Sequence, residues 1–394
     1  MLVASLSMLG PFSIDTAFPA FAQMRGEFEV GSAEMQWVVS AYLISFALMS
    51  PFHGPLSDAV GRKPVMIWGV GIYAVASVGC ALSVSLPMLL VFRVLQGLAA
   101  GGGVIVSRTL IRDVFEGAEA QRLMSITVMI FGVAPALAPI AGGWLLQLGP
   151  WPVVFWFLAA VGLALSLSVA LWLPETHPAE RRIPFRFTAM LRGLTVPARD
   201  LTFHRVVWSA ALSFGGQFLY IGAAAIFVVD LLGKGELDFW IFFVPMIGGM
   251  VLGSLVSTRS AGRVSGRRLI TWGLVAAAVG AVVNIVLAVG PTAAVLPWAV
   301  IGPALIAFGS GTAYPSQQLA LLDLFPQARG SAVSLFSFCT LTLNAITASF
   351  LAPHVTDTVL HLAIAAAVMV FAGLALWLWH LRAVPAEPAL EPAG

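Results

Sequence analysis

Apolar stretches about as long as a bilayer is thick recur along nearly the whole chain, and they constrain its fold more than any other feature. A helix needs about 20 mostly apolar residues to cross the hydrocarbon core. Of the 394 residues, 59% are hydrophobic and only 10% are charged, whereas soluble domains carry about 25% charged residues. We therefore predict an all-α membrane protein that crosses the bilayer many times.

Charged and turn residues divide the chain into twelve predicted transmembrane helices. After the sixth lies the longest polar stretch, residues 174–204, which is rich in proline and arginine. It separates an N-terminal six-helix bundle, residues 1–173, from a C-terminal six-helix bundle, residues 205–382. Residues 383–394, rich in alanine, proline and glutamate, are predicted to form a disordered tail. Related halves around a central site are a recurring transporter design. The spans are expected near residues 2–22, 34–53, 65–85, 87–107, 123–147, 151–173, 205–229, 238–258, 269–289, 295–315, 329–352 and 358–381.

The basic residues of the loops predict the orientation. The loops after odd-numbered spans carry only Arg25 and Lys234, whereas the loops after even-numbered spans and the C-terminal end carry most of the others. Short loops rich in lysine and arginine stay in the cytoplasm. We expect a multi-pass protein of the cytoplasmic (inner) membrane with both termini in the cytoplasm. Because the basic residues are dispersed, nothing indicates nucleic-acid binding.

Asp15 is the only charged residue in the first predicted span. A carboxylate in the bilayer costs about 2.5 kcal/mol or more on insertion scales and is rarely kept without a use. Asp15 is therefore a candidate proton carrier, cation ligand or structural partner. Arg93, in the fourth span, is expected at a matching depth, about 10 Å from the same membrane surface. An ion pair or a water-bridged contact between the two is thus feasible.

An apolar cavity and a nearby arginine act on a carboxyl group in opposite directions. Desolvation favours the neutral acid, whereas the positive charge of Arg93 favours the carboxylate. A group held between these influences can exchange a proton for a cationic or neutral substrate, so we interpret Asp15 as a proton carrier modulated by Arg93. The alternative is a static pair that ties spans one and four together. A sodium ligand is disfavoured because no second carboxylate lies within a span near Asp15.

Pro11 and Pro19 flank Asp15 at a spacing of four residues, so the three share one face of a helix. Each proline frees a backbone carbonyl and permits a bend. Such a bend would open polar backbone to a cavity beside Asp15. The alternative is that both prolines only shape helix packing, as many prolines in membrane helices do.

Residues 54–63, in the loop after the second span, read Gly-Pro-Leu-Ser-Asp-Ala-Val-Gly-Arg-Lys. They resemble the signature of the major facilitator superfamily, except that Ala59 stands where an arginine is usual. Asp58 is expected to pair with Arg112 of the loop after the fourth span, or to lie against a helix N-terminus, and so to hold the cytoplasmic side shut. The alternative is that the basic residues here serve orientation alone. The candidate gate residues are Gly54, Asp58, Gly61, Arg62, Lys63 and Arg112.

Three further motifs follow at the expected spans. Residues 13–15, Ser-Ile-Asp, with residues 18–20, Phe-Pro-Ala, resemble the first span of Bcr/CflA drug:proton antiporters, the bicyclomycin- and chloramphenicol-resistance branch. Residues 93–97, Arg-Val-Leu-Gln-Gly, resemble the family's fourth-span motif. Residues 134–143, Ala-Pro-Ala-Leu-Ala-Pro-Ile-Ala-Gly-Gly, resemble the fifth-span antiporter motif, with Ala138 in place of its first glycine. The resemblance covers the N-terminal half closely and the C-terminal half mainly in its span pattern. The resemblance implies a major facilitator fold. It also implies a proton-coupling role for Asp15 and Arg93.

The fifth-span motif contains Pro135, Pro139, Gly142 and Gly143 at spacings of three and four residues. Small residues let helix backbones approach closely in lipid. We therefore predict a tight seam between this span and a helix of the C-terminal half. The resemblance implies that this seam hinders proton leak through the empty carrier, and the alternative is ordinary helix packing.

Polar and aromatic side chains inside the spans are candidates for lining a substrate cavity. Drug pockets are mostly apolar with a few polar groups, and aromatic faces attract cations. The alternative for each residue is contact with lipid or a neighbouring helix. The preferred candidates are Tyr42, Gln96, Phe131, Gln217, Phe218 and Asn344.

No sequence feature indicates a cofactor. The glycine run at residues 101–103 lies in an apolar span and lacks the lysine and threonine of a phosphate loop. No histidines are spaced as a metal cluster. Transport would then have to be driven by an ion gradient rather than by ATP.

We therefore predict a monomeric, proton-coupled exporter (an antiporter) of small hydrophobic or cationic compounds, antibiotics included. The alternative within transport is an exporter of one endogenous metabolite, such as an amino acid derivative, a sugar or a siderophore. A third interpretation, an intramembrane enzyme or a substrate sensor, would need a catalytic dyad or a metal set, and only Asp15 with Arg93 is a candidate for it.

Overall fold

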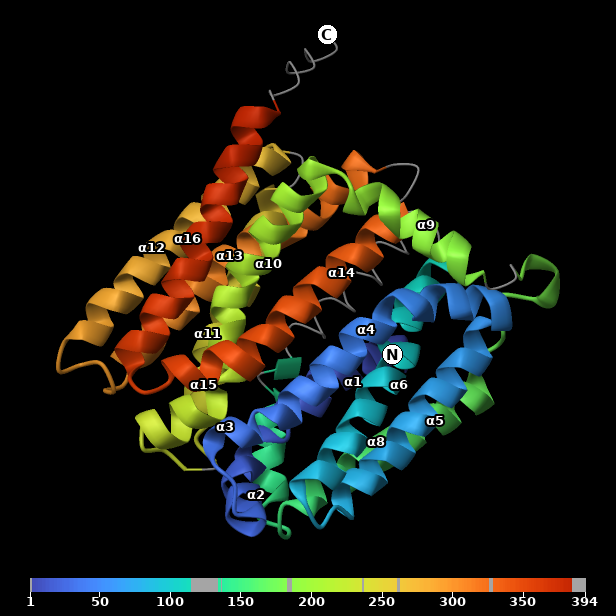
Figure 1. Cartoon of the computed structure of the whole chain (residues 1–394), viewed down its shortest axis with the longest axis horizontal. Coiled ribbons are helices and arrows are strands. Elements are labelled where there is room, and N and C mark those ends of the chain that lie inside the picture. The colour runs from blue at the N-terminus through green and yellow to red at the C-terminus, as the bar shows by residue number, and fades with distance from the viewer. Residues whose placement is uncertain are drawn as a thin grey trace.

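The computed structural model describes residues 2–114, 134–135, 137–182, 186–235, 237–260, 263–325 and 329–384, and every regular element in this part of the chain is helical. The helices form two bundles, the first blue to green and the second yellow-green to red in Figure 1. The N-terminal bundle contains α1 (Leu2–Asp15), a short 3₁₀ turn η1 (Phe18–Ala20), α2 (Phe21–Phe28), α3 (Ser32–Met35), α4 (Trp37–Val60), α5 (Arg62–Ala81), α6 (Leu86–Val114), helical residues 137–145 and α8 (Pro152–Trp172).

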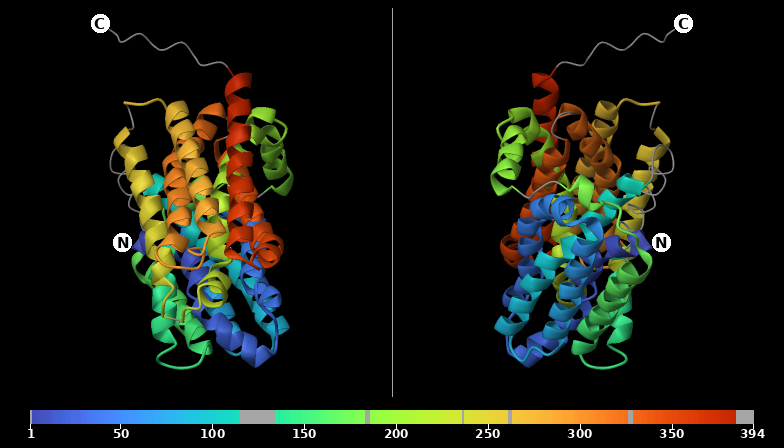
Figure 2. Two further views of the ribbon diagram at one scale, coloured as in Figure 1. Left: turned by 90° about the vertical axis from the view of Figure 1, so that its left-hand side faces the viewer. Right: turned by 90° about the vertical axis from the view of Figure 1, so that its right-hand side faces the viewer.

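The linker contains the 3₁₀ turn η2 (Ala179–Arg181) and α9 (Phe187–Ala198). The C-terminal bundle contains α10 (Leu201–Gly222), the π-helical turn η3 (Ile226–Leu231), α11 (Trp240–Ser260), α12 (Gly266–Val289), α13 (Trp298–Leu324), α14 (Arg329–Ile346), the π-helical turn η4 (Thr347–Leu351), α15 (Ala352–Val355) and α16 (Val359–Ala383). Figure 2 shows the long helices of both bundles running in the same general direction.

Eight of the described helices are long and apolar enough to cross a membrane. Three more helices, α1, α10 and α13, stand where spans were predicted, although α1 is interrupted. The fifth predicted span, residues 123–147, lies largely outside the described residues. The prediction of an all-α membrane fold is confirmed, and the described helices match the other eleven predicted spans in order.

The C-terminal bundle begins four residues before the predicted boundary. Asp200 caps α10, because its Oδ1 accepts hydrogen bonds from the backbone N–H groups of Thr202 at 2.6 Å and Phe203 at 3.1 Å. A side chain that satisfies these free N–H groups starts a helix at that point. Residues 201–204 of the predicted linker therefore belong to the helix.

Glycines bring neighbouring helices into backbone contact in both bundles. A Cβ added at Gly69 of α5 would lie 2.9 Å from the Cα of Gly102 in α6, so only glycine fits this crossing. In the C-terminal bundle, a Cβ at Gly309 of α13 would lie 2.6 Å from the Cα of Ala277 in α12. Close backbone approach is the main route to helix association in lipid. The glycine run at residues 101–103 is thus a packing feature.

The bundle ends differ in charge and in contacts. We call the end with Arg62, Lys63 and Arg192 of α9 the basic end; α16 also ends there (Figure 1). At the opposite end, where α2 and α3 lie, three contacts join the bundles, and we call them the seal. They are the stacked rings of Phe18 and Phe243 at 6.4 Å, the rings of Trp37 and Phe350 at 5.6 Å, and the ion pair from Arg25 Nη1 to Asp230 Oδ2 at 3.2 Å.

At the basic end the linker mediates contact between the bundles. The Phe187 ring of α9 stacks on Phe52 of α4 at 5.9 Å, and Gly193 of α9 faces Ser331 of α14. No ion pair among the described residues joins the two bundles there. The molecule is therefore held together more directly at the end opposite the basic one.

Candidate proton-coupling site

The helix α1 ends at Asp15 because the chain cannot continue its hydrogen-bond pattern. Pro19, four residues later, has no N–H group to donate to the Asp15 carbonyl. The backbone instead forms a turn, in which the Ala17 N–H bonds to Ile14 O at 3.4 Å and the Ala20 N–H to Ala17 O at 3.1 Å. The expected bend beside Asp15 is present as an interruption of the helix.

The Asp15 carboxyl group is buried without a partner. It is 3% exposed, and no described residue donates a hydrogen bond to it or forms an ion pair with it. An isolated carboxylate in such surroundings is strongly disfavoured, so burial favours the neutral acid over the charged form.

The Arg93 guanidinium lies fully buried beneath the interruption. Its Nε donates to the Val38 carbonyl at 2.9 Å and its Nη1 to the Ser13 carbonyl at 3.0 Å, while its Cζ lies 4.7 Å from the centre of the Tyr42 ring. Its Nη2 has no hydrogen-bond partner among the described residues. Carbonyl oxygens and an aromatic face therefore compensate the charge.

The direct ion pair that matching depth allowed between Asp15 and Arg93 is not formed. No oxygen of Asp15 lies within 4.0 Å of a nitrogen of Arg93. The guanidinium bonds to the backbone of α1 two residues before Asp15, and this geometry directs its donors to carbonyl groups. Arg93 Nη2 and the Asp15 carboxyl group both stay without a partner among the described residues.

A hydrogen-bond network inside the N-terminal bundle corrects the prediction for Gln96. Its Oε1 accepts from Arg93 Nη1 at 2.9 Å, and its Nε2 donates to Ser77 Oγ at 2.7 Å. Ser77 Oγ donates to the Tyr73 carbonyl, and the Tyr73 hydroxyl lies 2.5 Å from Ser13 Oγ. Gln96 is therefore buried in this network, where it helps to orient Arg93, and it does not line a cavity in this conformation. Sequence reasoning missed Tyr73 and Ser77, although their spacing of four places them on one face of α5.

Arg62 is the centre of a cluster at the basic end. Its Nη1 contacts Asp58 Oδ1 at 2.5 Å and also bonds to Ser57 Oγ, and its Nε donates to Asp113 Oδ2 at 2.8 Å. Asp58 thus pairs with Arg62 in this conformation, and its predicted pairing with Arg112 stays a prediction. Arg62 starts α5 only four residues after Asp58 and reaches it first, and the Arg112 side chain lies outside the described residues.

Glu175, which sequence reasoning missed, caps the start of α5. Its carboxylate accepts from the backbone N–H groups of Arg62 at 3.1 Å and Lys63 at 3.3 Å. Gly61 has a φ of +111°, and a Cβ there would lie 2.9 Å from an Arg182 nitrogen and closer still to Glu175 Oε2. The loop thus requires glycine at this position both for its backbone conformation and for space. A Cβ at Gly54 would meet nothing within 4 Å.

Gly142 of the fifth-span motif contacts the first span, and the predicted seam with a helix of the C-terminal half stays a prediction, because much of this span lies outside the described residues. A Cβ at Gly142 would lie 3.1 Å from the carbonyl carbon of Thr16 and 3.3 Å from Pro19 Cγ. Pro139 and Gly143 are buried and Pro135 is half-buried. The interruption of α1 creates a projecting carbonyl group, and the glycine provides the space for it.

The remaining cavity candidates are buried and divide between the bundles. Tyr42 packs under Arg93 in the N-terminal bundle. In the C-terminal bundle, Gln217 donates to Met250 Sδ at 3.5 Å, and the side-chain oxygens of Gln217 and Asn344 have no partner among the described residues. Buried polar atoms without partners cost about 1–3 kcal/mol each, so water or a ligand is expected at them. Phe131 lies outside the described residues.

An aromatic wall in the C-terminal bundle extends the prediction for Phe218. Its ring stacks on Phe214 at 6.4 Å, and Phe214 lies 5.2 Å from the Tyr314 ring of α13. Phe214 and Tyr314 are only half-buried, so the wall has an open face. Tyr314 was not predicted, because a lone tyrosine in an apolar span gives no separate signal.

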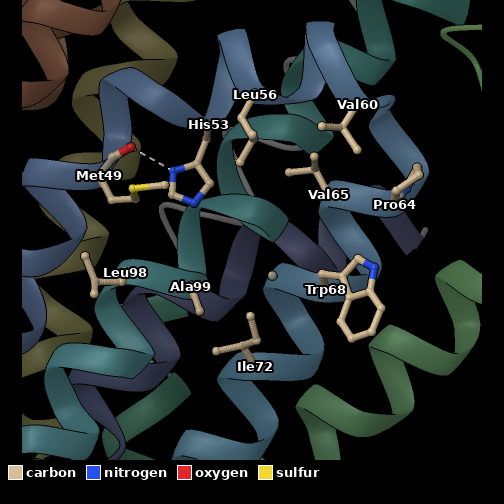
Figure 3. A pocket seen from close by; sticks show the side chains of 11 residues that line it. Met49, His53, Leu56, Val60, Pro64, Val65, Trp68, Ile72, Leu98 and Ala99 are labelled. Atoms are coloured by element: carbon tan, nitrogen blue, oxygen red, sulfur yellow. Dashed lines mark hydrogen bonds between the residues drawn. The ribbon is translucent and has the colours of Figure 1, made fainter. Parts of the chain in front are cut away.

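A cavity of about 270 Å³ lies elsewhere, between α4, α5 and α6 (Figure 3). Its lining is apolar except for His53, whose Nδ1 lies 3.0 Å from the Met49 carbonyl. Trp68 on its rim is 71% exposed on a predicted membrane span. The cavity therefore faces the lipid side of the N-terminal bundle, and none of the predicted site residues lines it.

Comparison with known proteins relates the chain to one family. The Major Facilitator Superfamily profile matches residues 3–348. The bicyclomycin resistance protein homolog of Haemophilus influenzae is 27% identical over 90% of this chain and 88% of its own length. Multidrug resistance protein D of Escherichia coli is 26% identical over 85% of this chain and 83% of its own length.

Solved structures show the same fold at low sequence identity. A D-xylose-proton symporter superposes with a TM-score of 0.74 at 17% identity, covering 98% of this chain and 97% of the symporter. A bacterial homolog of the lysosomal transporter Spinster, in an inward-facing and occupied conformation, gives a TM-score of 0.73 at 17% identity, with 98% of both chains covered. The chain belongs to the Major Facilitator Superfamily.

Proposed function

We propose that the protein is a proton-coupled exporter of small hydrophobic or cationic compounds, antibiotics included. The observation that carries the proposal is the buried Asp15 carboxyl group, which has no partner among the described residues and lies where the first helix is interrupted. An intramembrane carboxyl of this kind is typical of proton pathways. The names of the relatives, which refer to bicyclomycin and multidrug resistance, support the substrate class.

The contacts between the bundles support an inward-facing state. If the basic end is cytoplasmic, as the distribution of arginine predicts, both termini of this chain face the cytoplasm and the seal closes the periplasmic side. The aromatic contacts of the seal then block the path from Asp15 to the periplasm. The protein would act as a monomer in the inner membrane.

The transport cycle follows from the state of Asp15. In the inward-facing state the neutral acid releases its proton to the cytoplasm, the carboxylate left behind can turn to the free Nη2 of Arg93, and the drug binds at the C-terminal bundle. After the bundles rock and the seal opens, a proton from the periplasm returns to Asp15 and the drug leaves. The proton then moves down its gradient in each cycle while the drug moves out.

The C-terminal bundle supports the proposed substrate range. The aromatic wall of Phe214, Phe218 and Tyr314 offers ring faces that attract flat cations. The partnerless oxygens of Gln217 and Asn344 would accept hydrogen bonds from N–H or O–H groups of a substrate. These same oxygens favour the alternative, an exporter of one metabolite rich in such donors.

Proteoliposomes with an imposed pH gradient test the proposal. We expect uphill movement of at least one dye or antibiotic that a protonophore abolishes, and loss of this uphill movement in Asp15→Asn, because the amide carries no titratable proton. Glu34→Gln, which removes an exposed carboxylate from α3, is the matched control and should transport normally. Uphill transport by Asp15→Asn would refute the role of Asp15. Movement of one metabolite and no drug would favour the alternative.

A further inference from the structure

The interruption of α1 is clamped on both sides. Before it, Ser13 is held by its carbonyl to Arg93 Nη1 at 3.0 Å and by its hydroxyl to Tyr73. After it, the backbone N–H of Trp151 donates to Gln23 Oε1 at 3.0 Å and the Trp151 indole N–H to Glu27 Oε2 at 2.6 Å. Asp15 and Thr16 lie in residues 14–22, the stretch between these two fixed points.

Within this piece, the Thr16 carbonyl is not used by the backbone. Pro19 has no N–H to donate to it, the Ala20 N–H bonds to Ala17, and no described hydrogen bond ends on Thr16 O. The Thr16 carbonyl instead lies against the bare Cα of Gly142. Contact with this glycine therefore limits how far the end of α1 extends toward helical residues 137–145.

We propose that Gly142 is a positioning residue for Asp15: by admitting the Thr16 carbonyl, it fixes where α1 stops and keeps the adjacent carboxyl group out of water. This inference rests on the proposed role of Asp15 as the proton carrier. It assigns the fifth-span glycine to proton coupling through the first span. A methyl group at position 142 would overlap the Thr16 carbonyl, and because both flanks are clamped, the Asp15 segment must move.

The test compares Gly142→Ala with Gly149→Ala. A Cβ at Gly149 meets nothing within 4 Å, so this variant adds the same methyl group without contact. In Gly142→Ala we expect active drug accumulation to fall about tenfold and the pH of half-maximal transport to move about one unit toward acid, since a displaced and hydrated carboxyl loses its proton more readily. Equilibrium drug binding should stay within about twofold of wild type, because the substitution does not touch the aromatic wall of the C-terminal bundle.

A purely structural role predicts a different pattern. If Gly142→Ala only weakened packing, binding and transport would fall together and the pH profile would keep its midpoint, which would overturn the proposal. Equal behaviour of Gly142→Ala and Gly149→Ala would overturn it as well. The proposed role of Asp15 is tested separately, since uphill transport by Asp15→Asn would refute it.

Pro19→Ala keeps the proposal testable if Gly142→Ala does not fold. The new N–H can bond to the Asp15 carbonyl, extend α1 and draw the Thr16 carbonyl away from Gly142. We expect the same acid shift of the pH midpoint, again with binding retained. An unchanged midpoint in Pro19→Ala would contradict the idea that the end of α1 positions Asp15.

Discussion

The loops after the second and eighth spans have similar sequences, yet they are built differently. Residues 61–63 read Gly-Arg-Lys and residues 266–268 read Gly-Arg-Arg. In the N-terminal bundle the arginine, Arg62, is buried among two aspartates and a serine. In the C-terminal bundle Arg267 donates to the carbonyl groups of Leu381 at 3.4 Å and Val384 at 2.7 Å at the end of α16. The arginine of the first loop belongs to an ionic cluster, whereas the arginine of the second loop binds the carbonyl end of a helix.

The interiors of the two bundles also differ in charge. The N-terminal bundle holds Asp15 and Arg93 with a chain of hydrogen bonds around them, whereas the predicted site of the C-terminal bundle consists of neutral amides and aromatic rings. This division separates two tasks, since a proton site needs titratable charge and a site for varied drugs needs apolar surface. Under the proposed function, the two bundles would share a helical plan but divide proton chemistry from substrate contact.

The largest effect that tests this comparison is expected at Arg62. Arg62→Gln leaves two carboxylates unpaired and should lower the free energy of unfolding by about 2–3 kcal/mol, whereas Arg267→Gln removes bonds to carbonyls and should lower it by about 1 kcal/mol. Thermal unfolding in detergent measures both. Lys63→Gln and Arg268→Gln are the neighbouring controls. Equal losses at Arg62 and Arg267 would mean that the loops are equivalent after all.

A smaller effect is expected at the aromatic wall. Phe214→Ala removes the ring between Phe218 and Tyr314 and should weaken binding of a flat cationic dye about tenfold, the strength of one or two aromatic contacts. The pH midpoint of transport should not change, because the proton site lies in the other bundle. Equilibrium binding and the pH profile are measured on the same variant. A shifted midpoint would show that the two tasks are not separated.

The smallest effect is expected at the ion pair of the seal. Arg25 and Asp230 are 35% and 37% exposed, and exposed pairs contribute about 0.2–1 kcal/mol. The single reversals Arg25→Asp and Asp230→Arg should each speed the exchange of drug at low salt, and the double reversal should restore the wild-type rate. The difference should fade at high salt, where exposed charges are screened. A double reversal as fast as the single ones would exclude pairing across the seal.

The contacts of individual residues show where sequence reasoning stopped. Asp15 and Arg93 were found because charge inside an apolar span is costly wherever it lies. The absence of a direct ion pair between them was not predicted, because the carbonyl groups of Ser13 and Val38 also accept hydrogen bonds from the guanidinium. Glu175 gave no signal, since one carboxylate among linker residues caps α5 only after α8 has brought it there.

Sequence alone determined the helical spans, the two halves and the break beside Asp15, because each depends on local terms: apolar length, loop composition and a proline without an N–H group. Only the tertiary structure decided which groups meet across long sequence distances. Gly142 lies 126 residues from Thr16, and nothing local distinguishes its contact with α1 from one with the C-terminal half. Packing placed Gly142 against Thr16, since a projecting carbonyl needs a neighbour without a side chain.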